Sequence, residues 1–476
     1  MVTKLWDKGY ELDPRIERFE VSDDLVYDRR LIVPDVLGSI AHAAMLTKIG
    51  LLPLDAFHAL RAELANIAAL SQTGGFTLDA GDEDVHTKIE GWLTAKLGDA
   101  GKMIHTGRSR NDQVLVDMRL YTREAVVPVY TAVLDACDAL LDMATRHQHT
   151  PMPGYTHMQR AMLSSVGVWA GAFLESLLDN LTLLDAAVAL SDQNPLGSAA
   201  SYGVGLPLDR QYVSDLLGFA KVQSNVLYTQ NARGKFEAAI VQACCQVMLD
   251  LSKLAQDILL FTTSEYGFFE LDDSLTTGSS IMPQKKNLGA MEMLRAKGTI
   301  ILSWQQLMMT MLAGLPSGYN MDYQETKRPF MESLDLVEES SAVAGLTVSR
   351  LLPNEERLLA ACTPELYATD VAYDLVLKGV PFRDAYRKVA GMLDDLGDMD
   401  AHSVLANRAH QGTSGDLRLD ASAEIIAARR EAVADRSKQL EEIRAGLLSG
   451  TAAGLPAPPI PGRGSLPQPV GGAARS

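Results

Sequence analysis

The chain has 476 residues, a length that predicts about three domains of ordinary size. Apolar residues make up 47% and charged residues 22%, which is typical of a soluble globular protein. The net charge of −17 argues against non-specific binding to nucleic acid or to an anionic membrane surface, so an anionic substrate would need a local basic site.

The four cysteines lack a CxxC spacing, and two of them are adjacent on an apolar helical stretch. We interpret them as reduced core residues of a cytoplasmic protein. The N-terminus has no apolar h-region, and no run of about 18 apolar residues occurs, so neither a secretory signal nor a membrane span is expected.

The first predicted domain covers residues 1–107, where short helical segments are separated by prolines and by the pair Gly74-Gly75. Within it, the segment EDVHTKIE places Asp84 and His86 close to a predicted helix start. A lone histidine at such a place is more often a capping or surface residue than a catalytic one.

The segment HTGRSRNDQV, residues 105–114, sets Arg108, Ser109, Arg110 and Asn111 beside a glycine. Two guanidinium groups and two short polar groups on one turn suit a carboxylate. On this segment alone, a solvated charged loop that leads into a helix at Val114 is an equally good interpretation.

The segment MPGYTHMQRA, residues 152–161, makes a turn at Pro153-Gly154, and Thr156 and His157 follow it before a long helix. His157 titrates near neutral pH and could donate a proton to a leaving nitrogen. Taken alone, it is more often a structural histidine that a turn satisfies.

Long helices are predicted over 166–188, 240–258 and 291–312, where apolar residues recur every three or four positions. Helices this apolar must sit inside a bundle, and they define a central domain at 108–352. Because few runs alternate with period two, we predict a mainly α fold with short accessory strands.

The segment GSSIMPQKKN, residues 278–287, combines Ser279, Lys285 and Asn287 on a loop that starts with glycine. Successive N–H groups of such a loop can bind an anion and lower the cost of ionising a serine. An isolated GSS would be an ordinary solvated loop, but the full ten residues are much more specific.

The segment LPSGYNMDYQETKRPF, residues 315–330, adds Tyr319, Gln324 and Lys327, which would individually be read as polar surface. Shorter amphipathic helices then form a C-terminal domain at 353–448. Residues 449–476 are rich in proline and glycine and are predicted to be a disordered tail.

These segments contain no evident metal cluster, nucleophilic triad or cofactor cradle. They fit the removal of a proton from a carbon next to a carboxylate, a reaction that needs a base, donors for the developing dianion and an acid at the leaving group.

The motifs GSSIMPQKKN, HTGRSRNDQV and MPGYTHMQRA resemble those of the fumarase/aspartase superfamily and, within it, of the argininosuccinate lyase family. The resemblance runs from about residue 19 to residue 396. It implies the reversible elimination of argininosuccinate to arginine and fumarate, without a metal or an organic cofactor.

The resemblance also implies roles for individual residues. Ser279 would be the base, Lys285 and Asn287 would stabilise the aci-carboxylate, and His157, held by Glu292, would be the acid. The two succinyl carboxylates would be held by Thr156, Ser109, Arg110, Asn111 and Lys327. The arginine portion or the pocket would be contacted by Ser22, Asp84, Tyr319 and Gln324.

The family fold implied by the resemblance has three mostly helical domains. Its central helices form the core of a homotetramer, and each active site is drawn from three subunits. The expected partners are therefore a small-molecule substrate and further copies of this chain, with neither nucleic acid nor membrane.

Three places depart from the family pattern: Leu288-Gly289, the stretch 194–210, and the stretch 228–237. They leave open a sister lyase that releases fumarate from another N-substituted aspartate. A structural homologue that has lost catalysis is a further alternative, although the whole catalytic set is present.

Overall fold

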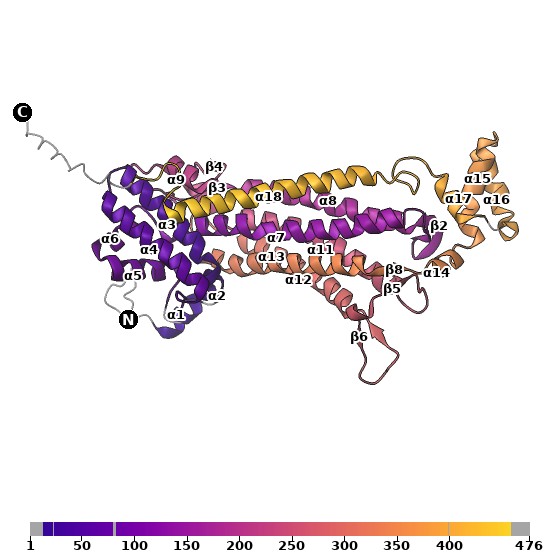
Figure 1. The fold of residues 1–476 in the computed structure, drawn as a ribbon, viewed down its shortest axis with the longest axis horizontal. Helices are drawn as coiled ribbons and strands as arrows, with labels where there is room; N and C mark the ends of the chain where they lie inside the picture. Colours follow the sequence, from indigo (N-terminus) through magenta and orange to yellow (C-terminus); the bar gives the residue numbers. More distant parts are fainter. Residues whose placement is uncertain (1–12, 22, 80–81, 398, 458–476) are drawn as a thin grey trace, which may run out of the picture. The chain divides into compact units, whose positions relative to one another are not determined.

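The computed structural model describes residues 13–21, 23–79, 82–397 and 399–457 (Figure 1). The chain is mainly helical, as predicted, and its longest strand has 7 residues. It divides into two compact units. The first comprises Met1–Met118, Gln193–Thr229 and Glu441–Ser476, and the second comprises Arg119–Asp192 and Gln230–Leu440.

The first unit is built around α3 (Ile32–Lys48), which is almost wholly buried and packs against α4 (Leu54–Thr73) and α9 (Arg210–Leu217). A left-handed Gly74, with φ 77°, ends α4. The parallel pair β3 (Gln193–Asn194) and β4 (Lys221–Val222) adjoins α9. The remaining elements of this unit are α1 (Pro14–Val21), α2 (Asp24–Asp28), η1 (Arg29–Leu31), α5 (Val85–Leu97), α6 (Asp99–Lys102) and η2 (Met103–His105).

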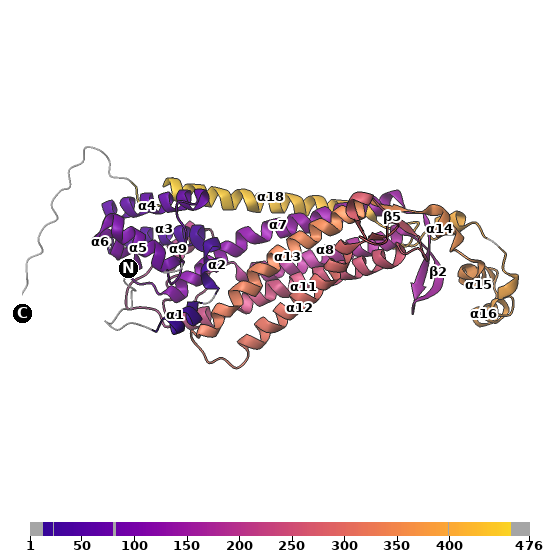
Figure 2. The same ribbon diagram turned by 90° about the horizontal axis from the view of Figure 1, so that it is seen from below.

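The second unit holds the long helices that the sequence predicted. Helix α11 (Lys235–Phe261) packs against α8 (Val166–Ser191), α12 (Gly289–Leu312) and α13 (Lys327–Ser349), and Figures 1 and 2 both show these four helices running alongside one another. Many of their apolar residues are buried, such as Leu177, Met248 and Leu294, which explains the helical spacing over 166–188, 240–258 and 291–312. Helix α12 also leaves Met293, Ile300 and Leu307 exposed.

Two further long helices continue from one unit into the other. Helix α7 (Arg110–Arg146) has its first residues in the first unit, and α18 (Leu419–Ser449) has its last residues there. Within the second unit α18 is held by ion pairs from Arg429 to Asp185 and from Arg430 to Asp135, each at 2.7 Å. The short helix α10 (Val226–Asn231) precedes α11.

The strands of the second unit form small antiparallel pairs. A hairpin of β1 (Pro151–Thr156) and β2 (Gln159–Ser165) precedes α8, and β5 (Phe269–Leu271) pairs with β8 (Leu351–Pro353). The prediction of a turn at Pro153-Gly154 is wrong, because both residues lie within β1 and the chain turns at His157 and Met158. The pair β6 (Thr277–Gly278) and β7 (Lys286–Asn287) closes the signature loop. The 3₁₀ helices η3 (Asp273–Leu275) and η4 (Met321–Thr326) lie in the connections.

Short helices follow residue 353, as predicted, but the prediction that they continue to about residue 448 is wrong, because Leu419–Ser449 form the single 31-residue helix α18. They are α14 (Glu355–Ala360), η5 (Pro364–Tyr367), α15 (Ala368–Leu377), α16 (Phe382–Ala390), η6 (Leu393–Asp395) and α17 (Ala401–Ala406). Leu163 of β2 packs into a small core with η5 and α17. The expected disordered tail, 449–476, lies outside the described residues from 458 onward. Before that point the Tyr212 hydroxyl donates to the Gly454 carbonyl at 2.6 Å.

Two helical stretches, Asp24–Lys48 and Val226–Phe261, are long and apolar enough to cross a membrane by composition alone. They are 83% and 61% buried inside the structure, respectively, as core helices of a folded protein are. All four cysteines are buried and free, which agrees with their interpretation as reduced core residues.

Candidate active site

In the signature loop between β6 and β7, two backbone N–H groups donate hydrogen bonds to the hydroxyl of Ser279. Its Oγ accepts the N–H of Met282 at 3.1 Å and that of Ile281 at 3.4 Å. The Asn287 side-chain amide donates to the Gly278 carbonyl at 3.4 Å, across the base of the loop. Figure 1 shows the loop standing away from the helices of the second unit.

Lys285 and Glu292 are exposed, on the loop and in the first turn of α12 respectively. Within the part of the chain that the structure describes, neither side chain makes a hydrogen bond or an ion pair. Both charges are therefore available to another molecule.

Thr156 and His157 lie at the exposed tip of the β1–β2 hairpin. His157 and Met158 form the two-residue turn, with φ of 53° and 61°. Two consecutive left-handed residues match the twist of a tight hairpin, but non-glycine residues pay about 1 kcal/mol or more each for this backbone. His157 is exposed at this strained turn, so its imidazole is accessible to solvent.

The HTGRSRND turn belongs to the first unit, and α7 begins there at Arg110 rather than at the predicted Val114. The earlier start has a local cause, because Asp112 Oδ1 accepts the Ser109 N–H at 2.8 Å and Ser109 Oγ accepts the Asn111 N–H at 3.3 Å. This exchange of side-chain and backbone bonds is a helix N-terminus of the capping-box kind.

Arg110 is engaged within the chain. Its Nε donates to Asp84 Oδ2 at 2.7 Å, and its Nη1 donates to Glu83 Oε1 at 2.6 Å. Asp84 is also the N-cap of α5, where its Oδ1 accepts the Thr87 N–H at 2.8 Å. Burial raises the pKa of Asp84, but the charges of His86 and Arg110 outweigh it, and the pKa is lowered overall. Two predicted site residues are thus joined to each other.

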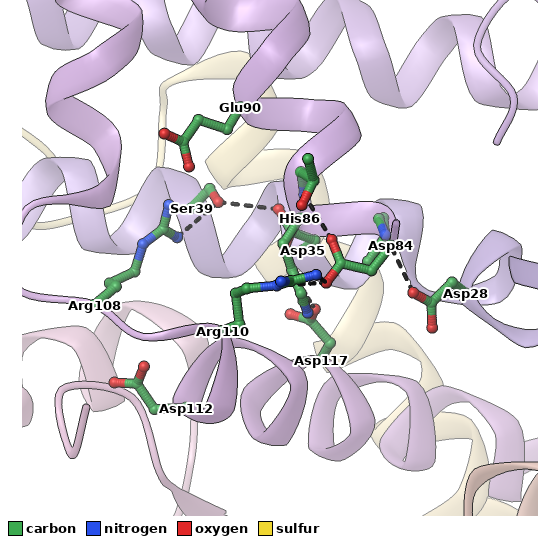
Figure 3. Close-up of polar contacts among 12 residues, drawn as sticks. Asp28, Asp35, Ser39, Asp84, His86, Glu90, Arg108, Arg110, Asp112 and Asp117 are labelled. Carbon is green, nitrogen blue, oxygen red and sulfur yellow. Dashed lines mark hydrogen bonds and ion pairs between the residues drawn. The ribbon is translucent and has the colours of Figure 1, made fainter. Parts of the chain in front are cut away.

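A buried polar network supports this turn (Figure 3). Arg108 donates to Ser39 Oγ at 2.9 Å, and Ser39 donates to Asp35 at 3.1 Å. Asp35 Oδ2 lies 2.6 Å from His86 Nδ1, and Asp117 Oδ2 lies 3.5 Å from the same nitrogen. The prediction that His86 is a capping or surface residue is therefore wrong: its side chain is 5% exposed.

Burial alone would lower the pKa of His86, but the hydrogen bond to Asp35 and the neighbouring carboxylates raise it overall. His105, close to Arg108, has the opposite balance: burial and that guanidinium lower its pKa to about 4. The two buried carboxylates thus favour the charged form of His86, while His105 stays neutral at neutral pH.

Asp35, His86 and Asp117 are also the donor set that could hold a metal ion, with ligand atoms all within 4.8 Å of one another. Here Asp35 already contacts the His86 ring and Ser39, to which Arg108 donates. The sequence analysis missed this cluster because its members come from three helices distant in sequence.

The last predicted segment starts at the loop before η4. Tyr319 is half-buried, with its ring centroid 5.4 Å from the Arg233 guanidinium. Gln324 is half-buried in η4, and Lys327, which begins α13, is 4% exposed rather than part of a polar surface. Ser22 lies outside the described residues.

The predicted catalytic residues do not converge within the chain. Among the described residues, no hydrogen bond or ion pair joins the signature loop at Ser279, Lys285 or Asn287 to the hairpin at Thr156 or His157. The predicted acid and the predicted base therefore occupy separate segments of the second unit.

Comparisons with known proteins agree with this set of motifs. Residues 11–302 match the model of a family described as Lyase. The chain is 46% identical over 420 residues to an argininosuccinate lyase of Sorangium cellulosum, a match that covers 88% of this chain and 97% of that protein. It is 42% identical over 417 residues to an argininosuccinate lyase of Parabacteroides distasonis, covering 88% and 93%.

Solved structures show the same architecture. An EDDS lyase in complex with formate matches with a TM-score of 0.78 and 25% identity, over 91% of this chain and 95% of that chain. A fumarate lyase:delta crystallin from Brucella melitensis bound to cobalt matches with a TM-score of 0.68 and 18% identity, over 89% and 94%, and shares the fold.

Proposed function

Because the chain belongs to the lyase family of the fumarase/aspartase superfamily, we propose that it cleaves argininosuccinate reversibly to L-arginine and fumarate. This is the last step of arginine biosynthesis. The main support is that the chain is 46% and 42% identical to two argininosuccinate lyases over nearly their whole length. The HTGRSRND motif points to the same family.

In the proposed mechanism Ser279 removes the proton from the succinyl carbon. The two N–H groups directed at its Oγ would stabilise the alkoxide, since a hydrogen bond to the charged form lowers a pKa. Lys285 and Asn287, at the other end of the same loop, would stabilise the aci-carboxylate that develops.

His157 is the proposed acid for the departing guanidinium nitrogen. It needs a partner that holds its ring, and Glu292 carries an exposed carboxylate without a partner among the described residues. Pairing the two across subunits would complete the acid without rearranging either element.

Substrate carboxylates would be held by Thr156, Ser109, Arg110, Asn111 and Lys327. Arg110 has five N–H donors and directs at least three of them to Glu83 and Asp84, which leaves at most two for a carboxylate. Ser22, Asp84, Tyr319 and Gln324 would contact the arginine portion or support the pocket.

We propose a cytoplasmic homotetramer. On α12, Met293, Ile300 and Leu307 are 56%, 41% and 45% exposed and recur every seven residues. Apolar residues at that spacing form a seam that packs against another helix. Such packing would bring the separate acid and base segments of different subunits together.

The first experiment is to mix purified protein with argininosuccinate and to measure arginine and fumarate together. We expect equal amounts of both, and no turnover by the Ser279→Ala variant at unchanged tetramer size. If the folded tetramer releases neither product, argininosuccinate is not its substrate. Near-normal turnover by Ser279→Ala would show that Ser279 is not the base.

A second experiment tests the sharing of active sites. Ser279→Ala and His157→Asn chains should each form inactive tetramers, because each lacks one proton-transfer group. Co-expression should restore part of the activity, since some sites would take Ser279 and His157 from different intact copies. Continued inactivity of proven mixed tetramers would contradict a shared site.

The alternative is a sister lyase that acts on another N-substituted aspartate, favoured by the departures at 194–210, 228–237 and 288–289. A panel of N-substituted aspartates, each assayed for fumarate release, separates the two functions. If another N-substituted aspartate has a higher kcat/KM than argininosuccinate, the alternative function is correct.

A further inference from the structure

Asn231, the last residue of α10, and the short turn that runs from it through Gly234 to α11 lie within the stretch that departs from the family pattern. In the second unit they contact the loop of residues 313–320, which connects α12 to η4 and carries Tyr319. We propose that Asn231 and Arg233 are positioning residues that fix Tyr319 and thereby help to select the amine half of the substrate. This proposal rests on the proposed function.

Asn231 fixes the backbone of the loop. Its Oδ1 accepts the Gly318 N–H at 2.8 Å, and its Nδ2 donates to Ser317 Oγ at 3.3 Å. Gly318 is left-handed, with φ 97°, so the chain reverses immediately before Tyr319. The hydrogen bond from the Gly318 N–H therefore sets the direction in which Tyr319 leaves the loop.

Arg233 fixes the ring. Its side chain is only 6% exposed, and its guanidinium carbon lies 5.4 Å from the centroid of the Tyr319 ring and 5.9 Å from that of Tyr323. The two ring centroids are 6.5 Å apart. A flat, permanently charged guanidinium near two aromatic rings is a cation–π arrangement that a lysine reproduces poorly.

Gly234 lies close to Leu312, the residue directly before the loop of residues 313–320. Its φ is 78°, and a Cβ built there would lie 2.7 Å from Leu312 Cδ2, at the end of α12. The turn thus touches the last residue of α12, the middle of the loop and the ring of Tyr319. The hydrogen bonds of Asn231 and the ring contact of Arg233 thus reach the loop at Ser317, Gly318 and Tyr319, and Gly234 leaves no room for a side chain beside Leu312.

The test compares Asn231→Ala with Asn231→Asp, which keeps an acceptor for the Gly318 N–H. An exposed asparagine on α4, changed in Asn66→Ala, is the control. We expect Asn231→Ala to raise the KM for argininosuccinate about three- to tenfold, the worth of one hydrogen bond, with kcat within about twofold. Asn231→Asp should recover most of the loss, and Arg233→Lys should raise KM about two- to fivefold.

A double-mutant cycle shows whether Asn231 acts through the tyrosine. If it does, Asn231→Ala should change KM less than about twofold in a Tyr319→Phe background, because the hydroxyl it positions is already absent. Fully additive effects on KM, or an unchanged KM in Asn231→Ala, would overturn the proposal.

Hydrogen exchange without substrate separates this proposal from the proposed function. The Gly318 amide should exchange about three- to tenfold faster in Asn231→Ala than in the wild type or in Asn66→Ala. Unchanged exchange would refute the positioning role even in an active enzyme. If exchange accelerates but the wild type does not cleave argininosuccinate, only the proposed function fails, and the same variants are assayed on the amine that the substrate panel selects.

Discussion

Replacing Asp112 by alanine should destabilise the first unit more than any ordinary surface change. The Asp112 side chain is fully buried, and its carboxylate accepts three backbone N–H groups, from Ser109 at 2.8 Å and from Gly197 and Ala199 at 2.9 Å each. Gly197 and Ala199 have φ of 86° and 52°, so the bonds also hold a strained loop against the HTGRSRND turn.

Each lost charge-assisted hydrogen bond costs about 1.5–3 kcal/mol. Relief of the buried charge offsets part of this, since burial raises the pKa of Asp112 despite the three donors. We therefore expect a net loss of about 2–4 kcal/mol for Asp112→Ala. In a cooperative unit of this size, that corresponds to a fall of about 5 to 10 °C in melting temperature.

The assay is thermal unfolding at one protein concentration and one scan rate, because assembly and irreversible steps move an apparent melting temperature. Asp99→Asn is the control, since that carboxylate is 94% exposed and forms an ion pair with Lys102 on the surface. It should melt like the wild type. An Asp112→Ala protein that melts within about 1 °C of the wild type would refute the reasoning.

Three further predictions concern backbone, charge and thiols. Gly234→Ala should lower stability by about 1–3 kcal/mol more than Gly314→Ala, measured by denaturant unfolding: both glycines have positive φ, but only the first would clash with Leu312. Because the pKa of His86 is raised above 6.5, its stabilising charge is fully present below that pH and is lost as the pH rises through the folded pKa. The melting temperature should therefore fall from about pH 6.5 upward, and less steeply in His86→Asn; equal slopes would contradict a charged His86. Native protein should react with fewer than about one thiol per chain in a thiol-reagent titration until it is unfolded, because burial raises the pKa of all four cysteines, to about 12 for Cys137 and Cys244 and about 11 for Cys245 and Cys362.

Residues close together in the sequence account for most of what could be predicted. The apolar spacing of 166–188, 240–258 and 291–312 depends only on helical geometry, and it predicted α8, α11 and α12. The start of α5 beside Asp84 was also predictable, because a helix N-cap is a local interaction. The hairpin before α8 was missed, since prolines and a bulge interrupt its alternation.

By itself, the sequence determined three of the long helices, the motif segments and the family, because each depends on residue types at short spacing. Tertiary structure alone decided the partners of the charged groups. Asp35 and His86 are 51 positions apart, and Asp112 and Gly197 are 85 apart, so no local pattern reveals either pair. Burial makes these pairings necessary, because a charged group removed from water is costly unless it is hydrogen-bonded or paired. The partner can come from any segment that the fold places beside it.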